Sequence, residues 1–202
     1  MSGRSMMKKI TALSVIVLMM LILASCGEKK GIYRGPEKRS GAFDLVMEKE
    51  RNPEKAMVSH WYWDGDTNNT TINVPDESED GIRITAIGGA SKSFSMGGKP
   101  VIPFKVYVED DKYVKGDEDK VYTTRQIVFT IHFGKNIESM EFETGDSFYL
   151  VNYDGNYVFY MKSYYFICDP ENPYYYTKDG KVYNKKTNNL TEEIPSSCYG
   201  EI

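Results

Sequence analysis

The sequence is poor in the residues that most often bind metals or carry out redox chemistry. Its 202 residues include only two histidines, His60 and His132, and three cysteines. Neither histidine has the ligand spacing to a cysteine, or to the other histidine, that a structural zinc site uses. The sequence therefore predicts no metal site and no cofactor.

Motifs for phosphate, calcium and nucleophilic catalysis are also missing. Residues 88–100 are rich in glycine, but Ser93 and Pro100 stand where a phosphate loop needs Gly and Ser or Thr. Residues 64–69 begin like a calcium loop but lack its Gly and its bidentate Glu, so they are interpreted as a turn. The histidines have no nucleophile motif nearby. We expect no enzyme activity, with a glycan hydrolase using paired carboxylates as the weaker alternative.

The charge balance argues against a nucleic-acid partner. The chain has 25 basic and 29 acidic residues, a net charge of −4. Cleavage before Cys26 would remove Arg4, Lys8 and Lys9 and no acid, leaving 22 basic and 29 acidic residues and a net charge of −7. Nucleic-acid binding depends on basic patches, so we predict no nucleic-acid partner.

The N-terminus contains the one long apolar run. Residues 10–23 follow Lys8 and Lys9 and are shorter than the roughly 20 residues that span a bilayer. This length is typical of a secretory signal. Residues 23–25 (LAS) then lead into Cys26. The order resembles the lipobox of bacterial lipoproteins; a buried N-terminal helix is the alternative.

The lipobox resemblance implies an address and a domain organisation. Residues 1–25 would be a lipoprotein signal peptide, and Cys26 would carry acyl chains such as palmitate that anchor the protein to a membrane. The rest would face the periplasm or the cell surface. Residues 26–55 are predicted to form a tether with a possible short helix at 43–50, and residues 56–202 a single β-rich domain.

Two cysteines remain beyond the lipobox. Cys168 and Cys198 would form a disulfide in an oxidising compartment. The alternative of two free thiols stays open, because exported proteins of bacteria with one membrane often have few disulfides.

Alternation of apolar and polar residues predicts two hairpins. Residues 104–109 and 125–133 flank a charged loop, and 125–133 place alternate apolar residues on one face. Residues 148–168 form the second predicted hairpin, with Asp154 and Gly155 as its turn.

Three segments resemble BspA-type bacterial leucine-rich repeats. The matching residues are Val74, Pro75, Asp80, Gly81, Ile84, Thr85, Ile87 and Gly88 in the first, Ile131, Phe133, Ile137 and Met140 in the second, and Asn172, Pro173, Tyr175, Asp179, Gly180, Val182, Tyr183, Asn184 and Lys185 in the third. The resemblance implies a mostly β fold: a short, degenerate, right-handed solenoid with an inserted hairpin and little helix. In its units the Asp-Gly pairs would form tight corners with positive φ. A β-sandwich is the alternative.

The resemblance also implies that Ile84, Ile87, Ile137 and Met140 share one core, and it suggests adhesion or another non-catalytic binding role. Trp61 and Trp63 would lie on one strand face and are the candidate ligand-binding residues for an unknown protein or glycan. Alternatively, they cover the end of the core. The second functional hypothesis is a structural or accessory subunit of an envelope complex.

Overall fold

The structure, a computed structural model, describes residues 37–49, 51–90, 101–108, 123–144, 147–151 and 157–202. In these ranges the chain is mostly β, as expected, with no α-helix and one 3-10 turn at Ser196–Cys198. None of the described residues forms a helix long and apolar enough to cross a membrane.

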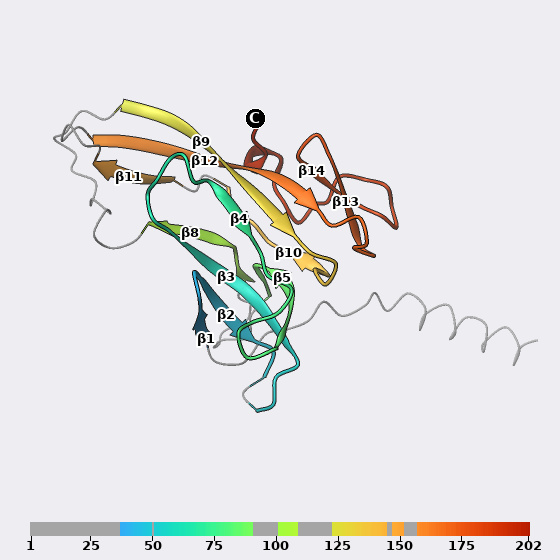
Figure 1. The fold of residues 1–202 in the computed structure, drawn as a ribbon. Coiled ribbons are helices and arrows are strands. Elements are labelled where there is room, and N and C mark those ends of the chain that lie inside the picture. Colours follow the sequence, from blue (N-terminus) through green and yellow to red (C-terminus); the bar gives the residue numbers. More distant parts are fainter. Residues whose placement is uncertain (1–36, 50, 91–100, 109–122, 145–146, 152–156) are drawn as a thin grey trace, which may run out of the picture. The chain divides into compact units, whose positions relative to one another are not determined.

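Two sheets contain most of the strands (Figure 1). The first sheet has the order β1-β2-β3-β5-β10, with β8 also paired to β3. Its strands are β1 (Glu37–Ser40), β2 (Phe43–Met47), β3 (Lys55–Trp63), β5 (Arg83–Ile87), β8 (Lys105–Val108) and β10 (Ser139–Met140). The second sheet has the order β11-β12-β9-β4. Its strands are β4 (Thr71–Asn73), β9 (Thr123–Phe133), β11 (Ser147–Val151) and β12 (Tyr157–Cys168).

Two short hairpins complete the described strands. They are β6 (Gly89–Ala90) with β7 (Val101–Ile102), and β13 (Tyr175–Lys178) with β14 (Lys181–Asn184). Asp179 and Gly180 both have positive φ at the turn between β13 and β14, a conformation that Asp-Gly tolerates well. The Asp-Gly corner expected there is confirmed.

The chain passes from one sheet to the other and back. It runs from β3 to β4 to β5, and later from β8 through β9 to β10, before β11 and β12 return to the second sheet. The pairs β3–β5, β3–β8, β5–β10, β4–β9 and β9–β12 are all parallel. Figure 1 shows β9 and β12 as two long neighbouring arrows, which pair over eleven positions.

One hydrophobic core joins the two sheets. Alternate residues of β9 (Ile127, Phe129, Ile131 and Phe133) are buried in it, which confirms the predicted alternation. The core also contains Ile84, Ile87, Ile137 and Met140, as expected. The register places Met140 of β10 beside Ile87 of β5, so two segments far apart in the sequence bury their apolar residues together.

The first predicted hairpin is wrong. Strand β8 pairs with β3, whereas β9 pairs with β4 and β12, so the two strands belong to different sheets. Val106 of β8 and Phe129 of β9 are both buried in the shared core. Alternation identified each strand and its buried face, but it does not specify the partner. Residues 109–122, between the strands, lie outside the described residues.

The second predicted hairpin is confirmed in its pairing, because β11 and β12 are antiparallel. Its Asp154-Gly155 turn lies outside the described residues.

The short helix expected at 43–50 is wrong. Residues 43–47 form β2, in which Phe43, Leu45 and Met47 enter the core at alternate positions. Residues 37–40, expected to be part of the tether, form β1, which pairs with β2 through a turn at Gly41 with positive φ. Phe43, Leu45 and Met47 recur every two residues, which is the period of a strand, so all three side chains lie on its buried face.

Candidate functional site

The two tryptophans do not form an exposed platform. Trp61 is 7% exposed and Trp63 is fully buried, and both rings make edge contacts with Phe129. The Trp63 indole donates hydrogen bonds to the carbonyl oxygens of Asp66 and Asn69. The expectation that these residues bind a ligand is wrong, and their contacts are those of core residues.

The segment that bonds to Trp63 is a turn, as predicted. Within it, the Asp64 carboxylate accepts a hydrogen bond from the backbone N–H of Asp66, and the Asp66 carboxylate accepts one from that of Asn68. Carboxylates engaged in this way stabilise a turn locally.

The disulfide expected between Cys168 and Cys198 is not present in the structure. Tyr199 forms a parallel bridge with Tyr164 of β12. Cys168 lies four residues beyond Tyr164 on that strand, or about 13 Å at the usual rise per residue. A disulfide requires Cα atoms within about 7 Å. The strand register therefore separates the two thiols.

Cys26, the predicted lipid-attachment residue, and residues 91–100, which contain the glycine-rich loop, lie outside the described residues.

A β-bulge in β3 builds a polar cluster on the outer face of the first sheet. Asp44 pairs with His60 and Leu45 with Val58, so Ser59 has no opposite residue on β2. Before the bulge Ala56 and Val58 enter the core; after it Trp61 and Trp63 do. Regular strands alternate their side chains between faces. The extra residue lets Ser59 and His60 point to the same side, away from the core.

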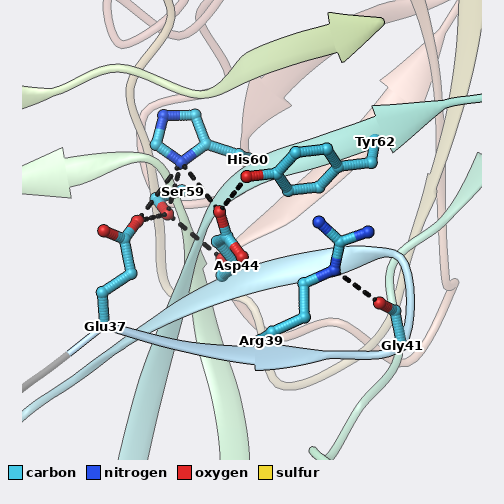
Figure 2. A network of polar contacts seen from close by, with 7 residues as sticks. All are labelled: Glu37, Arg39, Gly41, Asp44, Ser59, His60 and Tyr62. Carbon is cyan, nitrogen blue, oxygen red and sulfur yellow. Dashed lines mark hydrogen bonds and ion pairs between the residues drawn. The ribbon is translucent and has the colours of Figure 1, made fainter. Parts of the chain in front are cut away.

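Three strands contribute titratable groups to this cluster, which Figure 2 shows from close by. The Nδ1 atom of His60 (β3) lies 3.3 Å from Oε1 of Glu37 (β1) and 3.7 Å from Oδ2 of Asp44 (β2). Ser59 Oγ lies 3.0 Å from the same Nδ1 and 2.9 Å from Glu37 Oε1. The Tyr62 hydroxyl donates a 2.7 Å hydrogen bond to Asp44 Oδ2.

Aromatic contacts hold the imidazole and the tyrosine in place. The His60 ring stacks on the ring of Tyr107 from β8, with 4.6 Å between their centroids. The Arg39 guanidinium lies 3.5 Å from the Tyr62 ring centroid and donates a hydrogen bond to the carbonyl oxygen of Gly41. Such cation–π and stacking contacts restrict rotation about the side-chain torsions.

The surroundings shift the pKa of two side chains in the cluster, His60 and Tyr62. The pKa of His60 is below its usual value, chiefly because burial disfavours the charged imidazolium. The Glu37 and Asp44 carboxylates oppose this shift, and the Lys105 ammonium adds to it. The net direction makes His60 a neutral imidazole at pH 7. The hydrogen bond to Asp44 raises the pKa of the Tyr62 hydroxyl.

Ser59 and His60 are adjacent, as in a nucleophile and its base, but Ser59 is fully buried. Its hydroxyl lies within bonding distance of Glu37 Oε1 and the Asp44 carbonyl oxygen and is enclosed by the cluster. Substrate therefore has no path to this oxygen. The chemistry that the cluster can support is ligation through its nitrogen and carboxylate oxygens.

The second sheet has an open groove of about 580 Å³ on its outer face. Its apolar lining comes from Val128 of β9 and from Phe159 and Met161 of β12. Polar groups are provided by Gln126, Lys162, Ser163, Ser197 and Glu201. Ligand pockets commonly combine this size with an apolar lining and a few polar groups.

Gly200 explains how the C-terminal segment lies so close to this sheet. Its backbone N–H donates to the carbonyl oxygen of Tyr164, and a Cβ there would lie 2.4 Å from Ser163 Oγ and 2.9 Å from a Val128 methyl carbon. A side chain at this position would force Ser163 or Val128 to move. The wall of the groove formed by residues 197–201 therefore depends on one residue without a side chain.

Neither surface was predicted from the sequence. A signal for the first was present in residues 55–63 (KAMVSHWYW), where the apolar alternation changes parity between Val58 and Trp61. That change indicates a bulge at Ser59 and His60. No comparable signal in the sequence places Glu37 or Asp44 near His60, because their proximity depends on the order of the strands in the sheet.

Comparisons with known proteins leave the family open. No protein-family model and no curated protein matches this chain. A search of solved structures finds similarity to the crystal structure of the pneumococcal vaccine antigen PcpA, at 9% sequence identity and a TM-score of 0.22. The match covers 82% of this chain, and the chain spans 57% of the length of that structure.

Proposed function

We propose that this protein is a membrane-anchored, extracytoplasmic lipoprotein whose β domain binds a protein or glycan partner without catalysis. The anchor is the acylated Cys26. Support for it comes from the order of positive residues, apolar run, small residues and cysteine in residues 8–26. Two or more acyl chains on one cysteine hold a polar domain stably at a membrane.

The proposed domain is a short, degenerate, right-handed solenoid of the leucine-rich-repeat type. The passage of the chain from sheet to sheet supports this, as does the parallel pairing of β3 with β5, β5 with β10, and β9 with β12. An antiparallel sandwich would not require these pairs. The proposed hand follows the strong preference of parallel β connections. Antiparallel β1, β2 and β11 extend the two sheets at one edge each.

The groove on the second sheet is the observation on which the binding role rests. Met161, on the outer face of β12, is 42% exposed there, and Phe159 and Val128 extend the apolar surface. Apolar surface bordered by amide, hydroxyl and carboxylate groups suits a glycan or a peptide side chain. The alternative of a subunit joined through a strand edge is less well supported, because the edge strand β1 has the charged sequence EKRS, and charge discourages edge pairing.

The anchor is tested in a bacterial host by metabolic labelling with an alkyne fatty acid. The full chain and its Cys168→Ser variant should incorporate the label and partition into detergent, and Cys26→Ser should do neither. Labelling of Cys26→Ser, or an uncleaved and unlabelled native chain, contradicts the anchor.

The binding role is tested with the full chain in detergent on glycan arrays, and by pull-down from envelope fractions. The informative variant is Met161→Glu, which places a charge in the groove. Ile167→Glu is the matched control, because Ile167 lies on the same strand, is 39% exposed and does not line the groove. Binding should be lost in Met161→Glu and kept in Ile167→Glu. Equal loss in both variants, or no binding by the native chain, contradicts the proposal.

A further inference from the structure

We propose that Glu37, Asp44 and His60 form a binding site for one divalent transition-metal ion, with Zn²⁺ as the representative ion. This inference goes beyond the proposed function, because the cluster is on the first sheet and the groove is on the second. Neither site requires the other.

The distances between the donor atoms fit a shared ion. Bonds from Zn²⁺ to imidazole nitrogen and carboxylate oxygen are about 2.0–2.2 Å long, so neighbouring ligands of a tetrahedral ion are roughly 3.3–3.6 Å apart. His60 Nδ1 lies 3.3 Å from Glu37 Oε1 and 3.7 Å from Asp44 Oδ2. One ligand atom from each of the three residues lies within 4.8 Å of the other two.

The identity of the donors selects the class of metal. Calcium and magnesium prefer oxygen ligands alone, whereas an imidazole favours zinc and its neighbours in the first transition row. Nδ1 of His60 faces both carboxylates, so this nitrogen would bind the ion through its lone pair with the ring proton on Nε2. Two carboxylates then neutralise the double charge of the ion.

Outer contacts hold the ligands as metal sites require. The Tyr62 hydroxyl donates a hydrogen bond to Asp44 Oδ2, and the Ser59 hydroxyl lies within hydrogen-bonding distance of Glu37 Oε1. These are the two carboxylate oxygens that face His60 Nδ1. The stacking of His60 on Tyr107 fixes the plane of the imidazole. Partners of this kind orient metal ligands and tune their affinity.

The site is open on one side. The side chains of His60 and Asp44 are 16% and 15% exposed, whereas that of Glu37 is 53% exposed. An ion can therefore enter from solvent past Glu37 and keep water as a further ligand. The bulge at Ser59 is the feature of the backbone that turns His60 toward both carboxylates.

The test uses the full chain in detergent, stripped of metal with a chelator and titrated calorimetrically with Zn²⁺, Mn²⁺, Mg²⁺ and Ca²⁺. Imidazole nitrogen NMR signals are followed in parallel, because the chain has two histidines only. We expect one Zn²⁺ per chain, a shift of the His60 signals with Nδ1 as the ligand, and unchanged His132 signals. Mg²⁺ and Ca²⁺ should bind at least tenfold more weakly than Zn²⁺.

Matched variants locate the site. His60→Gln and Asp44→Asn should weaken Zn²⁺ binding at least tenfold, and Tyr62→Phe about tenfold through the outer contact. His132→Gln should leave it unchanged. If His60→Gln does not fold, as judged by circular dichroism, Glu37→Gln on the exposed edge strand gives the same test.

Three results would overturn the inference. They are no saturable Zn²⁺ binding, equal weakening by His132→Gln, and binding that leaves the His60 signals unshifted, as for adventitious ions on surface carboxylates. Loss of partner binding in Met161→Glu leaves this test unaffected, so failure of the metal site and failure of the proposed function are distinguishable.

Discussion

Gly88 is the residue whose substitution tests the packing of the first sheet most directly. It has φ of +65° and follows β5, and a Cβ there would lie 2.2 Å from the carbonyl oxygen of Glu141 and 2.6 Å from the backbone nitrogen of Phe104. Gly81 has φ of +75°, and a Cβ there would meet nothing within 4 Å. The two glycines share a backbone conformation and differ in crowding.

The magnitude follows from that difference. A non-glycine residue in the left-handed region costs about 1–2 kcal/mol, and alanine recovers about 0.4–1 kcal/mol by restricting the unfolded chain. Gly81→Ala should therefore destabilise by roughly 1 kcal/mol.

In Gly88→Ala the new methyl group must also displace backbone that is hydrogen-bonded. Gly88 donates to the Val58 carbonyl, Phe104 to that of Glu141, and Glu141 to that of Ile87. Losing two such bonds adds about 2 kcal/mol. The total of roughly 3 kcal/mol is a large part of the 5–15 kcal/mol typical of a domain.

The assay is urea unfolding of each variant, followed by far-ultraviolet circular dichroism and extrapolated linearly to water. Gly88→Ala should be less stable than Gly81→Ala by about 2 kcal/mol. A difference below about 0.5 kcal/mol, within the range of unremarkable surface changes, would show that Phe104 and Glu141 do not approach Gly88 and would refute the register of β10 beside β5.

Three further predictions concern Trp63, the Cys168 thiol, and the pair Cys168 and Cys198. Trp63→Ala should destabilise by about 3–5 kcal/mol in urea unfolding, and Tyr174→Ala, at an exposed tyrosine, by less than about 0.5 kcal/mol; equal effects would contradict the burial of Trp63. Burial raises the pKa of the Cys168 thiol from 9.0 to about 12. The protonated thiol therefore contributes stability that is complete below pH 9 and is lost as the pH rises toward 12. Iodoacetamide at pH 8 should alkylate Cys168 much faster in urea than in the folded chain. Mild oxidation of the folded protein should leave Cys168 and Cys198 unbonded by mass spectrometry, since the bridge between Tyr199 and Tyr164 places Cys198 too far from Cys168; an intramolecular disulfide would refute that bridge.

Local patterns predicted a large part of the fold. The alternation in residues 125–133 gave β9 and its buried face, because a strand places every second side chain on the same side. The Asp-Gly turn at 179–180 was equally local. Residues 43–47 show the limit of such patterns. Five residues followed by charged ones are too few to distinguish the two-residue period of a strand from the 3.6-residue period of a helix.

The candidate sites were much less predictable. Trp61 and Trp63 were correctly placed on one face, but which face is buried depends on the sheet opposite, where Phe129 packs against both rings. The cluster of Glu37, Asp44 and His60 required both a bulge and the order of three strands. The spacing of ligands along the sequence detects metal sites that lie within one helix, strand or loop. The ligands of this cluster come from three strands, so their spacing gave no signal.

The sequence by itself determined the mostly β composition, the positions of β8, β9, β11 and β12, the Asp-Gly corner at 179–180, and the acidic charge balance. These properties follow from side-chain volume, from backbone freedom and from periods of a few residues. Only the tertiary structure decided that β8 joins β3 instead of β9, that the two thiols lie apart, and that His60 faces two carboxylates. Each of these depends on which distant segments share a sheet, and that choice is made by burial of one common core.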